Sequence, residues 1–387
     1  MNVPALKEKF YTLYKNNNGE PSVFFAPGRV NLIGEHTDYN GGYVFPCTIN
    51  FGTYLIIKAN HEQVIRFATT NFSYKAEIPL SELYLKHGSE WVNYPLGVIN
   101  QFIKHGFAVS GFDMLFSGDI PNGAGLSSSA SIEMVAAVAL DYLLETRQKK
   151  VELIKISRAA ENEFVGMNCG IMDQFAIGMG KKESALALNC RSLEFQHVPL
   201  RLGEYKIVIA NTNKRRELAD SKYNERVAEC AVALEILRKV KPMVDLSAMN
   251  MDEFKKHSHL IADETIRKRA QHVISENNRV IEAIDALIGE DIVTFGKLMK
   301  LSHESLKEDY EVTGFELDTI VNEASKVDGV LGARMTGAGF GGCSVNFVRQ
   351  DKIDEFIKQV GENYTKKTGL VADFYIASVG KGAGKLE

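Results

Sequence analysis

Glycine and serine are concentrated in segment 121–131 in a pattern that suits a bound anion. Two glycines, Gly123 and Gly125, precede the three consecutive serines 127–129, and an apolar stripe with a helical period follows. Glycine lets the backbone approach a ligand closely, and the first turn of a helix has unpaired N–H groups and a partial positive charge. We therefore predict a phosphate-binding loop at a helix N-terminus, although an ordinary serine-capped helix fits the same residues.

This loop differs from two common nucleotide-binding motifs. It lacks the lysine that the sequence G-x-x-x-x-G-K-[ST] requires, so it is not a Walker A loop. Serine also stands where a dinucleotide-binding turn of the type G-x-G-x-x-G has its third glycine.

A second segment, 27–42, places four chemically versatile side chains among four glycines. These side chains are Arg29, Glu35, His36 and Asp38. Carboxylates and imidazole can exchange hydrogen bonds with several hydroxyls at once, which is what a polyhydroxylated ligand needs. The last three residues also fit a metal site or a solvated polar turn.

Two acidic residues stand out in segment 159–175. Glu161 shares its helical face with Phe164 and Val165, so its carboxylate is expected to point inward and to need a cation. A surface salt bridge is the simpler alternative. Asp173 follows Gly170 in an apolar neighbourhood. A fourth, glycine-dense segment, 332–343, is predicted as a loop that runs into a strand, either as a hairpin or as a wall against the nucleotide site.

The elements around these segments predict a mixed α and β structure. Strands are expected at 23–26, 53–59, 64–68, 112–117, 184–189, 193–198, 205–210, 343–348 and 371–379. Helical stripes follow the serine loop through Ile132, Val135, Ala139 and Leu143, continue at Leu153, Ile156, Ala160 and Phe164, and recur from Tyr223 to Leu237. Beyond about residue 212 the chain becomes rich in charged helical segments, and we place a domain boundary near residue 200.

Length and composition fit a globular protein of two domains. The chain has 387 residues, 45% of them hydrophobic, against about 150 residues for a typical domain. Its 45 basic and 49 acidic residues give a net charge of −4, which offers no electrostatic reason to expect a nucleic acid or an anionic membrane as partner. The five cysteines form no C-x-x-C pair, and no signal peptide or apolar span is present, so a cytoplasmic location is predicted. The single Trp91 is interpreted as a packing residue or a local anchor.

Three ordered motifs give the chain a resemblance to the galactokinases of the GHMP kinase superfamily. Residues 28–42 are similar to the galactokinase signature, residues 123–130 to the phosphate loop of the superfamily, and residues 337–342 to its third motif. The first motif is highly specific for galactokinases, whereas the other two are shared across the superfamily. Together the matches extend over nearly the whole chain.

The resemblance implies an enzyme that uses ATP and Mg²⁺ to convert α-D-galactose into α-D-galactose 1-phosphate, the first step of galactose catabolism by the Leloir pathway. It implies Asp173 as the base that acts on the C1 hydroxyl, Arg29 as the group that stabilises the transition state, and Ser129 with Glu161 as Mg²⁺ ligands. The residues implied in binding are Glu35, His36, Thr37, Asp38 and Tyr223 for the sugar, and Gly123, Ala124, Gly125, Leu126, Ser127, Ser128 and Ser129 for the triphosphate.

The fold implied by the resemblance is α+β, with two domains and the active site in the cleft between them. This agrees with an N-terminal domain over residues 1–200 and a C-terminal domain over residues 201–387. A monomer is expected.

Three other functions are alternatives to this one. A sibling kinase could act on N-acetylgalactosamine or a sugar acid. A galactokinase-like regulator would bind sugar and nucleotide without catalysis, but here the serine loop is complete and both Arg29 and Asp173 are present. A mevalonate-type kinase would not call for the polar cluster at residues 35–38.

Overall fold

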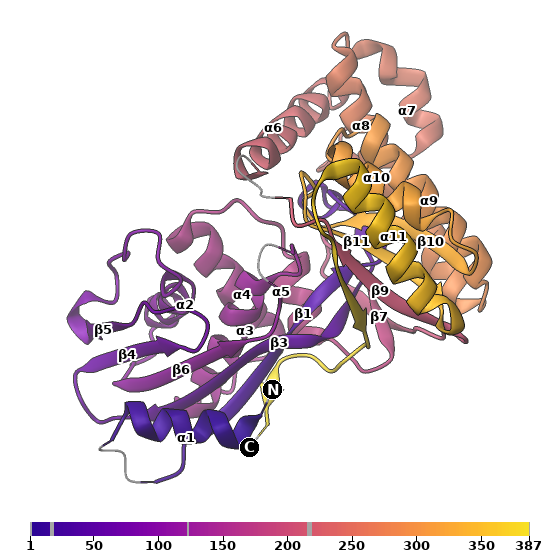
Figure 1. The fold of residues 1–387 in the computed structure, drawn as a ribbon. Coiled ribbons are helices and arrows are strands. Elements are labelled where there is room, and N and C mark those ends of the chain that lie inside the picture. The colour runs from indigo at the N-terminus through magenta and orange to yellow at the C-terminus, as the bar shows by residue number, and fades with distance from the viewer. Residues whose placement is uncertain (1, 16–18, 122–123, 215–218, 387) are drawn as a thin grey trace.

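The computed structural model describes residues 2–15, 19–121, 124–214 and 219–386. The described strands form sheets of six, four and three strands. Figure 1 shows the first half of the chain, in indigo to magenta, on one side of the molecule and the second half, in orange to yellow, on the other. The prediction of a mixed α and β structure is confirmed.

The six-stranded sheet is the framework of the N-terminal half. Its order is β13-β1-β3-β6-β4-β5, and β4 and β6 are its parallel pair. The strands are β1 (Ser22–Asn31), β3 (Pro46–Ala59), β4 (Val64–Thr69), β5 (Ala76–Pro79), β6 (Phe112–Gly118) and β13 (Gly384–Lys385).

Side chains that alternate along the strands of this sheet enter two different cores. Leu115 packs with helix α1 (Val3–Leu13) on one face, whereas its neighbours Met114 and Phe116 belong to the larger core on the other face. The helices of that larger core are α2 (Asn93–Lys104), α3 (Ser128–Leu143), α4 (Lys150–Ala159) and α5 (Met172–Met179). Figure 1 shows α1 below the sheet and these four helices above it.

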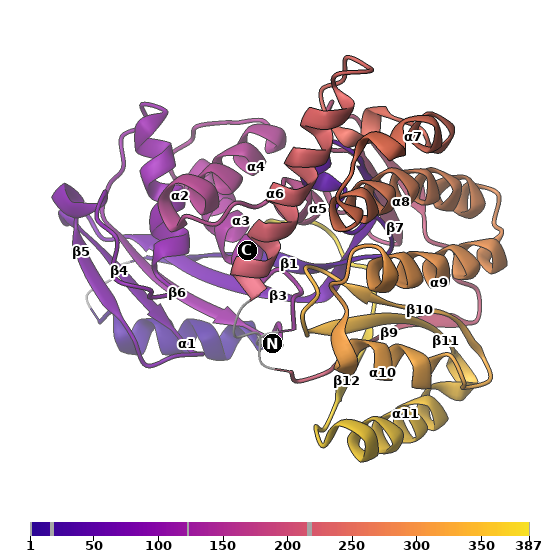
Figure 2. The same cartoon turned by 90° about the horizontal axis from the view of Figure 1, so that it is seen from above.

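The four-stranded sheet organises the C-terminal half in the order β10-β11-β9-β12. Helices α10 and α11 cover one face and α8 and α9 the other, as Figure 2 shows. The bounds are β9 (Tyr205–Asn211), β10 (Val330–Thr336), β11 (Cys343–Arg349), β12 (Asp373–Ala377), α8 (Glu264–Ile288), α9 (Ile292–Glu308), α10 (Gly314–Ala324) and α11 (Ile353–Thr368).

Two further groups of elements complete the fold. Helices α6 (Ala219–Leu237) and α7 (Met251–His257) pack with α8 around a separate core. The three-stranded sheet consists of β2 (Tyr43–Val44), β7 (Ser184–Asn189) and β8 (Phe195–Pro199). A core with members from β1, β9, β11, α8 and α9 joins the two halves of the molecule.

Each strand predicted from the sequence is present, but two are much longer than predicted: β1 continues to Asn31 where the prediction ended at residue 26, and β3 begins at Pro46 where the prediction began at residue 53. The prediction for segment 332–343 was wrong in its first part, because β10 continues to Thr336 and pairs with β11 as an antiparallel hairpin. The loop is therefore limited to residues 337–342. The expected helix through Phe164 ends as α4 at Ala159 and continues as a π-helical turn, η3 (Ala160–Val165).

The domain boundary near residue 200 stays a prediction. The chain passes from β8 to the four-stranded sheet between Pro199 and Tyr205, but Gly384 and Lys385 near its end pair with β1 of the first sheet. Within the described ranges, no helix is both long and apolar enough to cross a membrane.

Candidate active site

A cavity of about 350 Å³ collects the predicted site residues from distant parts of the chain. Its walls come from β1 and the segment after it, the start of α3, η3, α5, α6 and the loop of the β10–β11 hairpin. The predicted residues that line it are Arg29, Glu35, His36, Asp38, Gly125, Ser127, Ser128, Ser129, Glu161, Asp173 and Tyr223.

An ion pair between Arg29 and Asp173 lies at the centre of this set. Arg29 Nε donates to Asp173 Oδ1 at 2.7 Å, and Nη2 donates to Oδ2 at 2.8 Å. Ser127 Oγ donates to the same Oδ2 at 2.5 Å. Three donors therefore hold one carboxylate in a fixed orientation. Two of them are nitrogens of the planar guanidinium, and each donates to a different oxygen of Asp173.

The serine loop has a strained backbone at the start of α3. Ser127 precedes the helix with a φ of 62°, and its side chain makes no capping hydrogen bond. Because that hydroxyl is instead turned toward Asp173, the interpretation of this serine as an ordinary helix cap is wrong. The left-handed conformation disfavours a residue with a Cβ, which is a sign of functional constraint. The N–H groups of the first helical turn face a site suited to an anion.

Contacts between strand β1 and the serine loop keep the loop in place. Arg29 Nη1 donates to the carbonyl of Gly125 at 2.9 Å, and Ser131 Oγ donates to the carbonyl of Ala26 at 2.8 Å. A Cβ added at Gly28 would lie 2.7 Å from the carbonyl oxygen of Leu126, so only glycine permits this approach. Ala124 and Leu126 themselves are buried in the core, and Gly123 lies outside the described residues.

Asp38 projects into the cavity from the short helix η1 (Asp38–Asn40). Burial, and then the nearby charge of Asp173, raise the pKa of Asp38 to about 6. A Cβ added at Gly170 would lie 1.8 Å from Asp38 Oδ2, so the side chain of Asp38 lies directly on the backbone there.

Tyr223 from α6 forms the opposite aromatic wall. Its ring centroid lies 5.6 Å from that of His36 and 5.3 Å from that of Tyr39. His36 is held between Tyr39 OH, 2.9 Å from Nδ1, and the carbonyl of Ala338, 3.2 Å from Nε2. Burial lowers the pKa of His36 to about 3, so the imidazole is neutral at physiological pH.

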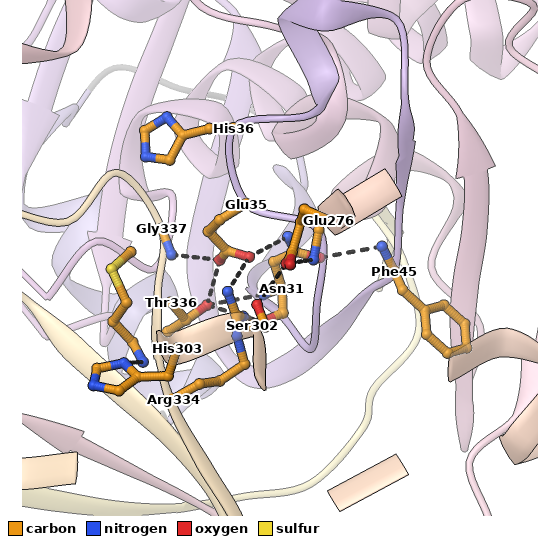
Figure 3. Close-up of polar contacts among 12 residues, drawn as sticks. Asn31, Glu35, His36, Phe45, Glu276, Ser302, His303, Arg334, Thr336 and Gly337 are labelled. Carbon is orange, nitrogen blue, oxygen red and sulfur yellow. Dashed lines mark hydrogen bonds and ion pairs between the residues drawn. The ribbon is translucent and has the colours of Figure 1, made fainter. Parts of the chain in front are cut away.

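Glu35 lies in a buried polar network, shown in Figure 3. Its Oε2 accepts hydrogen bonds from Asn31 Nδ2 at 2.6 Å and from Arg334 Nη2 at 2.8 Å. Its Oε1 accepts from the Gly337 N–H at 2.7 Å and from Thr336 Oγ1 at 3.2 Å. Four donors from β1 and the β10–β11 hairpin thus occupy the carboxylate, which links the two sides of the cavity.

Thr37 is the predicted sugar residue that the fold keeps out of the cavity. Its side chain is fully buried, and its hydroxyl lies 2.9 Å from the carbonyl oxygen of Gly34 and 2.7 Å from that of Tyr43. This hydroxyl closes the turn between β1 and β2, which is a structural role.

The sequence left open whether the glycine-dense loop is the turn of a hairpin or a wall of the site, and in the structure it is both. It joins β10 to β11, and its Gly337 lines the cavity beside Ala338. Gly337 has a φ of +85°, and a Cβ there would lie 3.2 Å from the carbonyl oxygen of Gly125. The hairpin therefore also forms a wall against the serine loop.

Glu161 and Ser129 have the chemistry of a Mg²⁺ site. Glu161 is only 7% exposed, and among the described residues no basic side chain forms an ion pair with it, so the surface salt bridge is not found. It accepts hydrogen bonds from Gln174 and Ser129. A carboxylate and a hydroxyl beside a phosphate-binding helix are hard oxygen donors of the kind that Mg²⁺ prefers. The residues present therefore fit this ion.

A second cavity of about 240 Å³ shares Ser128 and Ser129 with the first. Four aromatic residues contribute to its lining, namely Phe72, Trp91, Tyr94 and Phe116. Phe72 is 52% exposed, and Trp91 packs edge to face on Phe116 with ring centroids 5.5 Å apart. The sequence predicted Trp91 only as a packing residue or a local anchor. No motif marks Trp91 or Phe72, and only the fold places both beside the serine loop.

Comparisons with known proteins identify the class of this fold and site. The GHMP kinases N-terminal domain matches residues 93–181, and the GHMP kinases C-terminal domain matches residues 281–366. A crystal structure of mevalonate kinase superposes with a TM-score of 0.66 at 23% identity, covering 92% of this chain and 99% of the other. The chain has the two-domain fold of the GHMP kinases, as predicted.

Closer relatives narrow the assignment. The galactokinase galactose-binding signature matches residues 8–59. Galactokinase from Fusobacterium nucleatum is 50% identical over 386 residues, which is 99% of each chain. A crystal structure of Lactococcus lactis galactokinase complexed with galactose has a TM-score of 0.97 at 44% identity, covering 99% of this chain and 100% of that one. The chain belongs to the galactokinase family, and it is a kinase.

Proposed function

We propose that this enzyme transfers the γ-phosphoryl group of ATP to the C1 hydroxyl of α-D-galactose, giving α-D-galactose 1-phosphate and ADP. The observation that carries the proposal is the ion pair of Arg29 and Asp173, which stands in one cavity between the serine loop and the polar segment that contains Asp38. A sugar hydroxyl and a phosphate can reach this pair from opposite sides. The solved complex of the Lactococcus lactis relative with galactose supports the choice of sugar.

Asp173 acts on the attacking hydroxyl. Its carboxylate orients the C1 hydroxyl and takes its proton as the oxygen bonds to phosphorus. Arg29 holds that carboxylate in two places, and its charge stabilises the transferring phosphoryl group. Phosphoryl transfer needs mainly positioning and charge neutralisation, and a rigid pair of opposite charges provides both.

The remaining hydroxyls of galactose contact the polar walls of the cavity. Asp38 is an acceptor for two adjacent hydroxyls, and Tyr223 packs beside it against His36. Glu35 forms part of the same wall, although its two oxygens already accept four hydrogen bonds. A site with polar groups fitted to one arrangement of hydroxyls strongly disfavours an epimer, because the epimer leaves those groups unpaired.

The nucleotide occupies the serine loop and the aromatic cavity next to it. The triphosphate binds at the first turn of α3 through the loop that contains Gly125 and Ser127–Ser129. The adenine base of ATP lies against Phe72 and Trp91, because the second cavity opens directly from Ser128 and Ser129. Ser129 and Glu161 would hold Mg²⁺, which supplies charge neutralisation at the phosphates.

A panel of sugars tests this proposal. ADP release is measured with galactose, glucose and N-acetylgalactosamine, and the anomeric configuration of the product is determined by NMR. We expect galactose to be used and glucose, which differs at the C4 hydroxyl, to react with a kcat/KM lower by as much as about 10⁴-fold. The variant Asp38→Ala tests the sugar site. It should lose galactose turnover and, as an internal control, still bind the ATP analogue AMPPNP. Equal use of glucose or N-acetylgalactosamine by the wild-type enzyme would replace galactose with a wider or different substrate.

Three finer statements belong to the same proposal. The enzyme acts in the cytoplasm, functions as a monomer and carries out the first step of the Leloir pathway. Fractionation of cells and sedimentation of the purified enzyme test the first two, and growth of a deletion strain on galactose tests the third.

A further inference from the structure

A second layer of buried polar side chains lies directly behind Glu161. Gln174 Nε2 donates to Glu161 Oε2 at 2.6 Å and to Glu133 Oε2 at 3.0 Å. Both Gln174 and Glu133 are fully buried. One amide group therefore joins two carboxyl groups, and neither Gln174 nor Glu133 lines the cavity that holds the proposed substrates.

The three residues come from three elements that all contribute to the site. Glu133 lies four residues after Ser129 on α3, so the two side chains share one face of that helix. Glu161 lies in the π-helical turn η3, and Gln174 follows Asp173 on α5. The amide bridge thus connects the helix that follows the serine loop with the elements that carry the proposed metal ligand and the proposed base.

Burial of Glu133 is unfavourable for the stability of the fold. A carboxyl group with little access to water needs several hydrogen bonds or a cation to offset its loss of hydration. Glu133 Oε1 and Gln174 Oε1 are both buried with no hydrogen-bond partner within the described part of the chain. Burial, and then the charges of Glu161 and Asp173, raise the pKa of Glu133. An apolar side chain would suit this core better, so packing does not explain the glutamate.

We infer that Gln174, itself held by Glu133, positions the carboxylate of Glu161 to receive Mg²⁺. This inference rests on the proposed function, in which Glu161 and Ser129 bind that ion. Gln174 and Cys169 both donate to Oε2 of Glu161, which sets the rotation of the carboxylate and leaves Oε1 without a contact from either of them. Outer groups of this kind orient metal ligands, and their loss typically lowers metal affinity by about 10- to 100-fold.

The test measures how strongly Mg²⁺ and nucleotide binding are coupled. The dissociation constant of AMPPNP is determined by calorimetry in EDTA and in excess Mg²⁺. The ratio of the value in EDTA to the value in Mg²⁺ measures the coupling, and this ratio is compared among variants. Glu133→Met removes the acceptor for Gln174 at similar volume, and it should lower the ratio by about 10-fold. Glu133→Gln keeps a carbonyl acceptor and adds an amide that can donate to Gln174 Oε1, so it should keep the wild-type ratio.

Thermal unfolding of the same variants separates positioning from packing. If Glu133 only fills space, Glu133→Met should leave the ratio unchanged and should stabilise the fold or leave it unaffected, because it removes a poorly compensated buried polar group. If Glu133 positions Gln174, the ratio should fall even though the melting temperature is unchanged or higher. Should Glu133→Met fail to fold, Gln174→Met breaks the same bridge from its other end.

Glu161→Gln is the reference that separates this inference from the proposed metal site. If it lowers the ratio and Glu133→Met does not, the positioning role is wrong and the metal site stands. If Glu161→Gln itself leaves the ratio unchanged, the metal assignment is wrong and the inference is wrong with it. If Glu133→Gln and Glu133→Met lower the ratio equally, the positioning role is also wrong, because the first variant retains the acceptor for Gln174.

Discussion

Arg29 and Asp173 form a forked ion pair although 144 positions separate them in the chain. The guanidinium donates from Nε at 2.7 Å and from Nη2 at 2.8 Å. Arg29 belongs to β1 and Asp173 to the first turn of α5. Because both elements contribute to the larger core of the N-terminal half, the fold itself sets the orientation of this carboxylate before any substrate binds.

The variant Asp173→Asn tests the proposed base. The amide keeps the size of the side chain but cannot accept the proton of the C1 hydroxyl. We expect turnover to fall at least about 100-fold, while the dissociation constant of AMPPNP stays close to the wild-type value. Coupled ADP release and calorimetry measure the two quantities. Undiminished turnover would remove Asp173 from the chemical step.

The pKa of Asp38 predicts how galactose affinity depends on pH. Burial and the charge of Asp173 raise this pKa to about 6 in the free enzyme, and the sugar hydroxyls need the ionised carboxylate as their acceptor. Affinity should therefore be constant above pH 7 and fall by up to about 10-fold per pH unit below 6. Calorimetry with galactose between pH 5 and pH 8 measures this. Asp38→Asn should bind weakly at every pH, and a decline of the same size in that variant would assign the titration to another group.

Gly170→Ala is expected to disturb the sugar site from behind. The new Cβ would lie 1.8 Å from Asp38 Oδ2, so the carboxylate must turn away from its present position. The KM for galactose should rise about 5- to 150-fold, since a displaced hydrogen-bonding group costs roughly 1–3 kcal/mol. The KM for ATP should change little. Gly384→Ala, where no atom lies within 4 Å of the added Cβ and the backbone is not left-handed, is a control for replacing a glycine away from the cavity. An unchanged galactose KM would contradict the assigned position of Asp38.

Phe72→Ala tests whether the aromatic cavity binds the base of ATP. Stacking of a base on an aromatic ring contributes about 1–3 kcal/mol, so nucleotide affinity should fall about 5- to 150-fold while the galactose KM is maintained. Phe315→Ala is the matched control, because this ring is also exposed, at 62%, but lies on α10 in the other half of the molecule. The cavity has a different role if both variants bind AMPPNP as the wild type does.

Three buried histidines predict a loss of stability in mild acid. Burial lowers the pKa of His36 and His303 to about 3 and that of His272 to about 4. Below about pH 6.5 the unfolded chain binds protons that these folded side chains do not, so each histidine removes up to about 1.4 kcal/mol of stability per pH unit as the pH falls. Buried carboxyl groups act in the opposite direction, because burial raises the pKa of Asp38, Glu35, Glu133 and Glu161 in the folded state. The contribution of a histidine is therefore measured as the difference between the wild type and a variant that lacks it.

Scanning calorimetry at pH 5, 6 and 7 compares the wild type with the variant His303→Asn, in which an amide oxygen can replace Nδ1 as the acceptor for the Met335 N–H. Because the variant lacks one buried neutral imidazole, its melting temperature at pH 5, relative to that at pH 7, should be higher than in the wild type. The same change in melting temperature with pH in both proteins would show that His303 is not kept neutral in the folded state.

The amino-acid sequence alone predicted those strands and helix ends that are determined by residues close to one another in the chain. The strands at 53–59 and 112–117 follow from β-branched and aromatic runs, and the start of α3 follows from glycines and serines before an apolar stripe. The motifs likewise identified the family and the residue types of the site. These features are local, since side-chain periodicity and backbone freedom are set within a few positions along the chain.

Tertiary structure alone decided which of those residues meet. Thr37 belongs to the same motif as Asp38, yet its hydroxyl is used inside a turn and does not line the cavity. Trp91, Gln174 and Glu133 carry no motif that marks them, and their positions follow from how α2, α3 and α5 pack on the first sheet. Contacts between residues far apart in sequence depend on the packing of whole elements, and no local pattern contains that information.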